Sequence, residues 1–237
     1  NSVILSFEDG SIFVADGVIG ADGIHSIVRE QLFGPEAPIF AGMSAYRSII
    51  SVQLLDGKNL NNFVKWWGPT PQSQIVMFLI NRGKEFFVFA TMPEVSGGKE
   101  SWSKEGDIGA LRSHFGKFHG DAKAVLYACD ETLQTALYER NPLSRWSEGA
   151  VTLIGDACHA MMPFMAQGAA MGLEDAVVLS RCVDTSEEWS TAIRRYEGTR
   201  IERTSKIQLG SNQNEWLREA GNPNWVYGYD AWRVTLD

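Results

Sequence analysis

A short apolar strand that runs into a long loop of small residues is the most constraining feature of this sequence. Residues 150–154 predict a buried strand, residues 155–168 a loop rich in Gly, Ala and Met, and residues 169–183 a helix. Near the amino terminus, residues 18–20 likewise lead through a Gly-punctuated turn into a short helix over residues 26–32, with Ser26 as its cap. Both segments predict strand-to-helix units.

The middle of the chain has a pattern typical of an antiparallel sheet. Short runs of β-forming residues alternate with turn signals, and a hairpin with its turn at Asp9-Gly10 opens the chain. The predicted strands cover residues 46–52, 63–67, 74–80 and 85–92, and helices are predicted over residues 107–118 and 122–129. Strand-to-helix ends therefore flank a β-rich middle, which predicts an α+β composite rather than a simple alternating α/β chain.

The last part of the chain is predicted to be helical. A long helix after Thr185 is expected to reach about residue 220, with Thr185 and Glu188 at capping-box spacing. Four of its side chains recur every three or four residues: Trp189, Ile193, Tyr196 and Arg200. Its basic residues alternate with glutamates, which predicts a solvated face for Arg194, Arg195, Arg200, Arg203 and Lys206. The aromatic tail, residues 225–236, is expected to dock.

Composition excludes several classes of function. Lys and Arg number 21 against 29 Asp and Glu, which gives a net charge of −8 and a pI near 5.1. Because no basic cluster is present, nucleic-acid and anionic-membrane partners are not expected, and no apolar run approaches the length of a membrane span. The three cysteines form no C-x-x-C pair, which favours a reduced, cytoplasmic compartment.

Two stretches have residues suited to binding chemistry, and the first is Gly20-Ala21-Asp22-Gly23. Glycines at a strand-to-helix junction let the backbone approach a phosphate or a sugar closely. Asp22 could accept a hydrogen bond from a ribose hydroxyl or from an amide of the loop. The residues alone favour the simpler interpretation, an Asp-Gly turn that reverses the chain.

The second stretch begins with Gly155-Asp156 and continues to Glu174-Asp175. It places a carboxylate directly after a buried strand, where open α/β sheets bind ligands. A helix then starts near Gly168 among small residues that leave its first amides bare. Such amides suit a flavin, whose reduced ring carries charge at its N1–C2 edge. A Gly-rich loop packed on a buried helix fits the residues equally well.

The remaining candidates are weaker. Cys158 and His159 are adjacent, so their side chains are expected to point apart, and no metal site is predicted. Glu174 and Asp175 are interpreted as a helix face. No G-x-S-x-G sequence is present to anchor a Ser-His-Asp set, and no catalytic residue is identified.

Together the two stretches resemble the single-component FAD-dependent aromatic hydroxylases, the family that contains salicylate hydroxylase and the hydroxynicotinate monooxygenases. The first fits the family's DG pattern with Gly20-Ala21-Asp22-Gly23, Ser26 and Arg29. The second fits its GD pattern with Trp146, Gly149 and residues 151–159, continued by Pro163, Gln167-Gly168-Ala169 and Glu174-Asp175-Ala176. The tail, residues 225–230, is similar to the hydroxynicotinate branch, so the resemblance covers nearly the whole chain.

The resemblance implies a domain organisation and an activity. Residues 1–40 and 141–184 would form part of an FAD-binding, Rossmann-like domain of the glutathione-reductase type. Residues 41–140 would form an antiparallel substrate domain, and residues 185–237 a C-terminal helical segment with an aromatic tail. The activity would be hydroxylation of a small aromatic or pyridine carboxylate or phenol with FAD, NAD(P)H and O2, and a homodimer is the assembly considered.

The same resemblance implies roles for individual residues. Asp156, together with Gly155, would hold the ribityl or ribose part of FAD, and Pro163 would pack beside the isoalloxazine ring. The amides of Gly168, Ala169 and Ala170 would face the N1–C2 edge of the ring. Asp22, Gly23 and Arg29 would engage FAD and NAD(P)H. The substrate pocket would be lined by Phe78, Phe164 and Met165.

Two departures from the family pattern change these expectations. No two glycines in the chain are separated by a single residue, so the family's G-x-G-x-x-G fingerprint is absent. The chain is therefore expected to be a C-terminal portion that lacks the first βαβ unit, has an exposed sheet edge and is inactive alone. Phe164 stands where relatives often place a histidine, so the ring substrate and the acid–base residue are not identified.

Two alternatives stay open. One is another flavin-dependent oxidoreductase, such as a quinone-pathway hydroxylase; a flavin halogenase is disfavoured because Trp66-Trp67 does not supply a Trp-x-Trp-x-Ile signature. The other is a non-catalytic module that keeps the fold for oligomerisation or partner binding. Flavin affinity distinguishes the second alternative from the enzymes.

Overall fold

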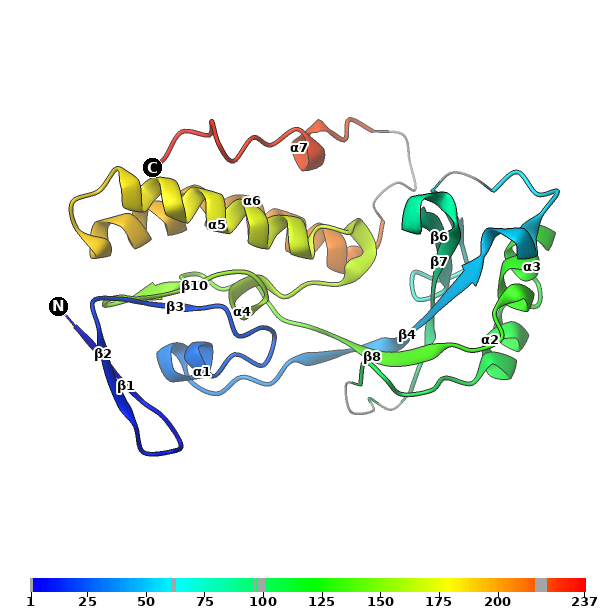
Figure 1. The fold of residues 1–237 in the computed structure, drawn as a ribbon, viewed down its shortest axis with the longest axis horizontal. Coiled ribbons are helices and arrows are strands. Elements are labelled where there is room, and N and C mark those ends of the chain that lie inside the picture. The colour runs from blue at the N-terminus through cyan, green and yellow to red at the C-terminus, as the bar shows by residue number, and fades with distance from the viewer. Residues whose placement is uncertain (1, 61–62, 96, 98–100, 216–220) are drawn as a thin grey trace. The chain divides into compact units, whose positions relative to one another are not determined.

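The computed structural model describes residues 2–60, 63–95, 97, 101–215 and 221–237. Its contacts divide the chain into two compact units (Figure 1). The first unit comprises Asn1–Ile39 and Glu139–Asp237, and the second comprises Phe40–Tyr138. The first unit is therefore assembled from the two ends of the sequence.

A small mixed sheet organises the first unit. Strands β3 (Val18–Gly20) and β10 (Val151–Leu153) pair in parallel, and β9 (Ser147–Glu148) pairs antiparallel to β10. Strand β3 is one edge of this sheet in the described part of the chain. A side chain at Gly20 would lie within 2.6 Å of Leu153, so only glycine allows this close approach. Because the two strands are parallel, the turns that follow them lie at the same edge of the sheet.

The amino-terminal elements form as the sequence predicts. Strands β1 (Val3–Ser6) and β2 (Ile12–Ala15) make an antiparallel hairpin, which confirms the Asp-Gly turn. Helix α1 (Ile27–Phe33) begins after Ser26, whose side-chain oxygen accepts a hydrogen bond from the Arg29 amide. The predicted cap is therefore confirmed.

The stretch predicted as a loop over residues 155–168 contains regular structure. It includes the one-turn helix α4 (Asp156–His159) and a 3-10 turn (Pro163–Met165). Helix α5 (Gly168–Asp184) follows, and α6 (Trp189–Gln213) packs beside it (Figure 1). The prediction that this last helix reaches residue 220 is wrong, because α6 ends at Gln213; residues 216–220 lie outside the described residues.

The predicted capping box between α5 and α6 is also wrong. Glu188 is the residue before α6, but its side chain makes no capping hydrogen bond. Thr185 instead closes α5, since its hydroxyl donates to the carbonyl oxygen of Arg181 at 2.7 Å. Thr185 is therefore the residue after α5 rather than the first capping residue of α6, which begins only after Glu188.

Residues 185–237, which the sequence analysis set apart, belong to the first unit. The core of this unit joins the sheet to α5 and α6 and contains Trp146, Leu153, Val178, Cys182, Ile193 and Tyr196. The tail docks, as expected, and includes the one-turn helix α7 (Asn224–Tyr227). Arg181 donates to the carbonyl oxygen of Ala231 at 2.8 Å, and Arg203 donates to the carbonyl oxygen of Val226 at 2.9 Å.

The second unit is a five-stranded sheet with the order β5-β6-β7-β4-β8. Its strands are β4 (Ile39–Ser51), β5 (Val64–Trp67), β6 (Gln74–Ile80), β7 (Glu85–Pro93) and β8 (Leu133–Glu139). The predicted antiparallel pairing is confirmed for β4 with β7, β5 with β6 and β6 with β7. Strand β8 was not predicted, because only Thr135 and Tyr138 among its residues favour strands and pairing with β4 decides its conformation.

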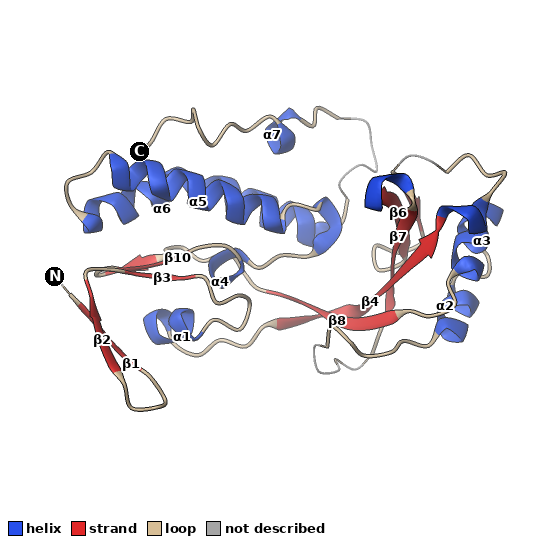
Figure 2. Cartoon of the chain, viewed as in Figure 1, coloured by secondary structure: helices blue, strands red, loops and turns tan. Residues whose placement is uncertain are grey.

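Two helices cover one face of this sheet. Helices α2 (Ile108–His114) and α3 (Gly120–Ala128), blue in Figure 2, lie beside the strands. Their shared core includes Ile75, Met77, Phe86, Val88, Leu111, Phe115 and Val125. Across the residues that the structure describes, no helix combines the length and apolarity needed to cross a membrane.

Candidate functional site

Two strand-to-helix turns that are far apart in the sequence meet in the first unit. The DG turn (residues 21–26) follows β3, and the GD turn (residues 154–160) follows β10. Parallel pairing of β3 with β10 places both turns at one edge of the sheet. Arg29 of α1 joins them, because its Nη1 donates to the carbonyl oxygen of Cys158 in α4 at 3.4 Å. The structure thus brings together the two stretches that the sequence singled out.

The DG turn is closed by its own side chains. Asp22 accepts hydrogen bonds from the Ser26 hydroxyl at 2.5 Å and from the amides of Ile27 and Val28 at 2.8 and 3.1 Å. These amides belong to the first turn of α1 and have no partner inside the helix. Burial would raise the pKa of Asp22, but the hydrogen bonds outweigh it and the pKa is lowered. Asp22 therefore serves as the anionic cap of α1.

A cavity of about 460 Å³ opens beside the DG turn. Its lining includes Arg29 and Arg140, whose side chains are 3% and 5% exposed. Glu36 pairs with Arg29 and lies 3.6 Å from the guanidinium of Arg140. Burial and the charge of Arg29 lower the pKa of Arg140. Two guanidinium groups thus share one carboxylate, which makes this part of the wall suited to an anionic group.

The GD turn is arranged differently. Gly155 adopts φ +61°, a conformation that favours glycine, and Asp156 is exposed at the start of α4. Helix α5 packs closely against this turn through glycines. A Cβ atom at Gly168 would lie 3.9 Å from Oδ1 of Asp156, and one at Gly172 would lie 3.8 Å from Cα of Gly155. The Asp156 carboxylate consequently lies beside the first residue of α5.

The amino terminus of α5 has no side-chain cap. Gln167 precedes the helix and makes no capping hydrogen bond, and the first helical bond runs from the Met171 amide to the Gln167 carbonyl oxygen at 2.8 Å. For the amides of Gly168, Ala169 and Ala170, no acceptor is found among the described residues. Their small side chains leave these donors accessible, and the partial positive charge of the helix end favours a negative group there.

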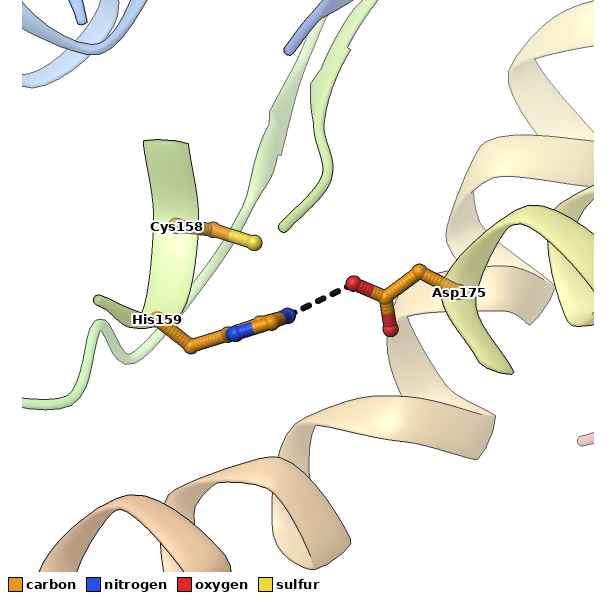
Figure 3. Close-up of side chains that lie close together, drawn as sticks. All are labelled: Cys158, His159 and Asp175. Carbon is orange, nitrogen blue, oxygen red and sulfur yellow. Dashed lines mark hydrogen bonds and ion pairs between the residues drawn. The ribbon is translucent and has the colours of Figure 1, made fainter. Parts of the chain in front are cut away.

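A buried ionic cluster lies beneath the GD turn. Oδ2 of Asp175, on α5, lies 2.6 Å from Nε2 of His159 (Figure 3). Oδ1 of Asp175 accepts a hydrogen bond from Nε of Arg200 at 2.8 Å. Arg200 also binds Glu174 at 2.6 Å. The side chains of Asp175 and Arg200 are 0% exposed. This cluster joins α4, α5 and α6 at one point.

These positions correct two predictions. Glu174 and Asp175, predicted as a helix face, bind Arg200 between α5 and α6, and Arg200 is buried rather than on a solvated face. The sequence contained a signal for the burial of Arg200, although not for the identity of its partner. Arg200 recurs at helical spacing with the apolar residues Ile193 and Tyr196, and an arginine on a buried face needs a carboxylate partner.

The charges of the cluster stabilise one another. Burial would raise the pKa of Asp175, but the hydrogen bond and charge of His159, the charge of Arg200 and the Gly155 amide hold it below its ordinary value of 3.8. Burial would lower the pKa of Arg200, yet Asp175 and Glu174 raise it above its ordinary value. Asp175 and Arg200 therefore form an ion pair at neutral pH.

The side chains of Cys158 and His159 do not point apart, contrary to the prediction. The helical backbone of α4 turns both toward Asp175, so that one potential metal-ligand atom of each of these three residues lies within 4.8 Å of the others (Figure 3). Burial raises the pKa of the Cys158 thiol well above 9.0. Because Arg200 already supplies the positive charge that Asp175 needs, this set is better suited to hydrogen bonding than to a metal cation.

The predicted substrate-pocket residues lie on both units. Phe164 and the exposed Pro163 are in the 3-10 turn of the first unit, and Phe164 is partly exposed. Met165 is 2% exposed and belongs to a core cluster, which places it behind the surface of the turn. Phe78 lies on β6 of the second unit, partly exposed, with its ring centroid 5.2 Å from that of Phe87.

Comparison with known proteins gives one family match that spans both turns. The model of the family described as "FAD binding domain" matches residues 2–197. Two 6-hydroxynicotinate 3-monooxygenases are similar over nearly the whole chain. That of Bordetella bronchiseptica is 38% identical over 99% of this chain, and that of Pseudomonas fluorescens is 37% identical over 100%. The chain spans 62% of the length of each of these relatives.

Solved structures agree with this assignment. A salicylate hydroxylase in complex with its substrate superposes with a TM-score of 0.85 at 27% identity, covering 97% of this chain and 66% of that one. A variant of HpxO from Klebsiella pneumoniae complexed with FAD superposes with a TM-score of 0.75 at 26% identity, covering 90% of this chain and 55% of that one.

Proposed function

This chain belongs to the FAD binding domain family, and from that premise we propose that it carries part of the active site of an FAD-dependent aromatic monooxygenase. The substrate is a small aromatic or pyridine carboxylate or phenol, and NAD(P)H and O2 are co-substrates. The observation that carries this proposal is the meeting of the DG turn and the GD turn at one edge of the sheet. The two similar 6-hydroxynicotinate 3-monooxygenases make a hydroxylated pyridine acid the first substrate to test.

The residues of the GD turn fit one part of FAD. The exposed carboxylate of Asp156 can accept hydrogen bonds from ribityl or ribose hydroxyls. The amides of Gly168, Ala169 and Ala170 can donate to the N1–C2 edge of the ring, because they have no acceptor among the described residues. When bound, the flavin supplies the redox chemistry by which O2 is activated.

The chain's own groups then act by orientation and charge. The bare amino terminus of α5 stabilises negative charge at the pyrimidine edge of the flavin. Phe164 would offer apolar surface for the substrate ring, and Pro163 of the same 3-10 turn would lie beside the isoalloxazine. Arg29 and Arg140, in the cavity beside the DG turn, engage an anionic phosphate of NAD(P)H. Asp22 supports this cavity indirectly, as the cap of α1.

One part of FAD has no matching feature in this sequence. The pyrophosphate of a dinucleotide is usually held by a G-x-G-x-x-G turn, and no G-x-G sequence occurs in the chain. We therefore propose that these 237 residues bind FAD more weakly than a complete site does and do not hydroxylate substrate alone.

An absorbance titration of the purified chain with FAD tests this proposal. We expect the flavin bands to shift when FAD binds. We expect the affinity for FAD to fall at least about tenfold in Asp156→Ala, which removes a group proposed to bind FAD but no core contact. Asp130→Ala, at an exposed aspartate of the second unit, is the matched control. A spectrum that the protein never perturbs would contradict the flavin role.

Turnover is measured in the same preparations. NAD(P)H consumption and hydroxylated product are followed with 6-hydroxynicotinate and with salicylate. We expect no product from this chain alone. Substrate-dependent hydroxylation by the isolated chain would disprove the proposed inactivity and support the proposed reaction.

A further inference from the structure

We propose that Asp175 is the positioning residue of the cofactor half-site, because its carboxylate holds both ends of the helix that carries Asp156. The inference rests on the proposed function and deepens it. Asp175 itself touches no ligand, since its side chain is 0% exposed beneath the GD turn. It acts through the backbone and side chains that it binds.

A single oxygen of Asp175 binds the start and the end of α4. Oδ2 accepts from the amide of Gly155, the residue before α4, at 3.0 Å. The same oxygen lies 2.6 Å from Nε2 of His159, the last residue of α4 (Figure 3). Asp156 lies between these two points. Its position is therefore fixed from both sides by one buried group.

Local forces do not hold α4 in place. The helix has four residues, far fewer than an isolated helix needs for stability in water. Gly155 provides no side-chain cap, and its backbone conformation, φ +61° and ψ −143°, is one that other residues rarely adopt. The turn therefore depends on a partner from another part of the chain.

Asp175 links α4 to the same helix that presents the bare amides. It lies on α5, two turns after Gly168, and α6 holds its other oxygen through Nε of Arg200 at 2.8 Å. Arg200 in turn binds Glu174 and the carbonyl oxygen of Met171. Asp175 and its ion pair with Arg200 thus fix the backbone that carries Asp156 relative to the amides of Gly168–Ala170. These two groups are the ones proposed to bind different parts of one flavin.

The test compares Asp175→Asn with Glu174→Gln. Glu174 is the neighbouring carboxylate on α5; among the described residues its hydrogen bonds and ion pairs are with Arg200 and Arg203 and none is with the GD turn. The first readout is amide hydrogen exchange at residues 155–159 in the protein without flavin. The second is the affinity for FAD, from the absorbance titration. Thermal unfolding of each variant reports loss of stability separately.

For Asp175→Asn we expect exchange at the Gly155 amide to rise about tenfold or more and FAD affinity to fall by a similar factor, as when a supporting group around a ligand site is removed. For Glu174→Gln we expect both quantities to change less than about threefold. Equal effects of the two substitutions would overturn the proposal, because they would show general loosening of the ionic cluster.

A second pair of variants covers the case in which Asp175→Asn does not fold. His159→Leu removes one of the two groups at the ends of α4 that Asp175 binds and leaves the pair with Arg200 intact, whereas His159→Gln keeps a donor near the position of Nε2. We expect faster exchange in α4 and weaker FAD binding in the first variant, and recovery of both in the second. Identical exchange rates and FAD affinities in the two variants would count against the positioning role of Asp175.

Failure of the proposed function and failure of this inference give different results. If the unmodified chain does not perturb the FAD spectrum, the flavin role of this chain fails. Hydrogen exchange still decides the role of Asp175, because it needs no ligand. Unchanged protection at Gly155 in both Asp175→Asn and His159→Leu would reject the inference even if FAD binds.

Discussion

The DG turn and the GD turn follow paired parallel strands, yet they differ in how the amino terminus of the next helix is capped. Each comes directly after one of two paired parallel strands. In the DG turn, Asp22 and Ser26 cap α1 from within the turn. In the GD turn, Asp156 is exposed, the first amides of α5 have no acceptor among the described residues, and Asp175 supports the backbone from below.

The difference shows how a loop can be ordered and still be open to a ligand. A local cap uses the donors at a helix end, so that the end is stable but occupied. Support from a buried carboxylate 20 residues further along the chain orders the backbone and leaves the outer donors free. Substitutions in the two turns and in the buried cluster can therefore separate local from distant support.

Breaking the distant support should cost the most stability. Arg200→Met removes one partner of a fully buried ion pair and leaves Asp175 and Glu174 without their shared cation. We expect the free energy of unfolding to fall by about 3–5 kcal/mol, measured by urea denaturation. Arg194→Met, at an exposed position of the same helix, is the control and should change it by less than about 0.5 kcal/mol. A loss below about 1 kcal/mol for Arg200→Met, the size expected for a surface ion pair, would contradict the role of the cluster.

The pH dependence of stability should report the charge on Asp175. Its pKa is below the ordinary value of 3.8 in the folded protein, so its charge stabilises the fold above that value. This contribution is lost as the pH falls through the lower, folded-state pKa. We therefore expect the difference in free energy of unfolding between the unmodified protein and Asp175→Asn to be largest at neutral pH and to decrease in acid. The measurement is urea unfolding across a pH series. A difference that increases in acid would show that the charged form of Asp175 does not stabilise the fold.

Matched substitutions should separate the two turns. Asp22→Ala removes the acceptor of the Ile27 and Val28 amides at the start of α1, and we expect it to lower the free energy of unfolding by about 1–2 kcal/mol. Asp156→Ala, in the GD turn, removes an exposed carboxylate and should change the free energy by less than about 0.5 kcal/mol. The order of the two variants should be reversed in FAD titrations. If Asp156→Ala destabilised the protein as much as Asp22→Ala does, the contrast between the turns would be lost.

Supplying a local charge at the bare helix end should make the GD turn more like the DG turn. Ala169→Glu places a carboxylate in the first turn of α5, where residue 169 is exposed. We expect it to raise stability by about 0.3–1 kcal/mol and to weaken FAD binding, because the added charge competes for the same amides. Ala169→Gln has nearly the same shape without the charge. Tighter FAD binding by the glutamate variant would argue against an anionic edge at this position.

Much of the fold could be predicted because local signals and the tertiary structure agree. The hairpin, the cap at Ser26, strand β10 and four strands of the second unit follow from turn residues and period-two patterns. Strand β8 could not be predicted, since Thr135 and Tyr138 are its only residues with a clear strand preference and pairing with β4 makes the segment extended. The predicted capping box is wrong because Thr185 follows the end of α5 and Glu188 precedes the start of α6, so that both residues lie in the connection between the two helices.

The candidate site divides in the same way. Gly155, Asp156 and the small residues at the start of α5 were recognisable as a strand, turn and helix in sequence order, because their roles depend on neighbours along the chain. The cluster beneath them was missed. His159 is 16 residues from Asp175, and Arg200 is 25 residues from it, so no local pattern indicates that they share one carboxylate.

The sequence by itself determined the two strand-to-helix turns, the β-rich insertion between them and the absence of a G-x-G fingerprint, since each of these is a matter of residue type and spacing. Only the tertiary structure decided that β3 and β10 are adjacent and that Arg29 reaches the GD turn. It also decided that Asp175 is buried with Arg200 rather than solvated. The physical reason is that a charged side chain is stable in water or beside an opposite charge in the interior, and the choice depends on which helices pack against each other.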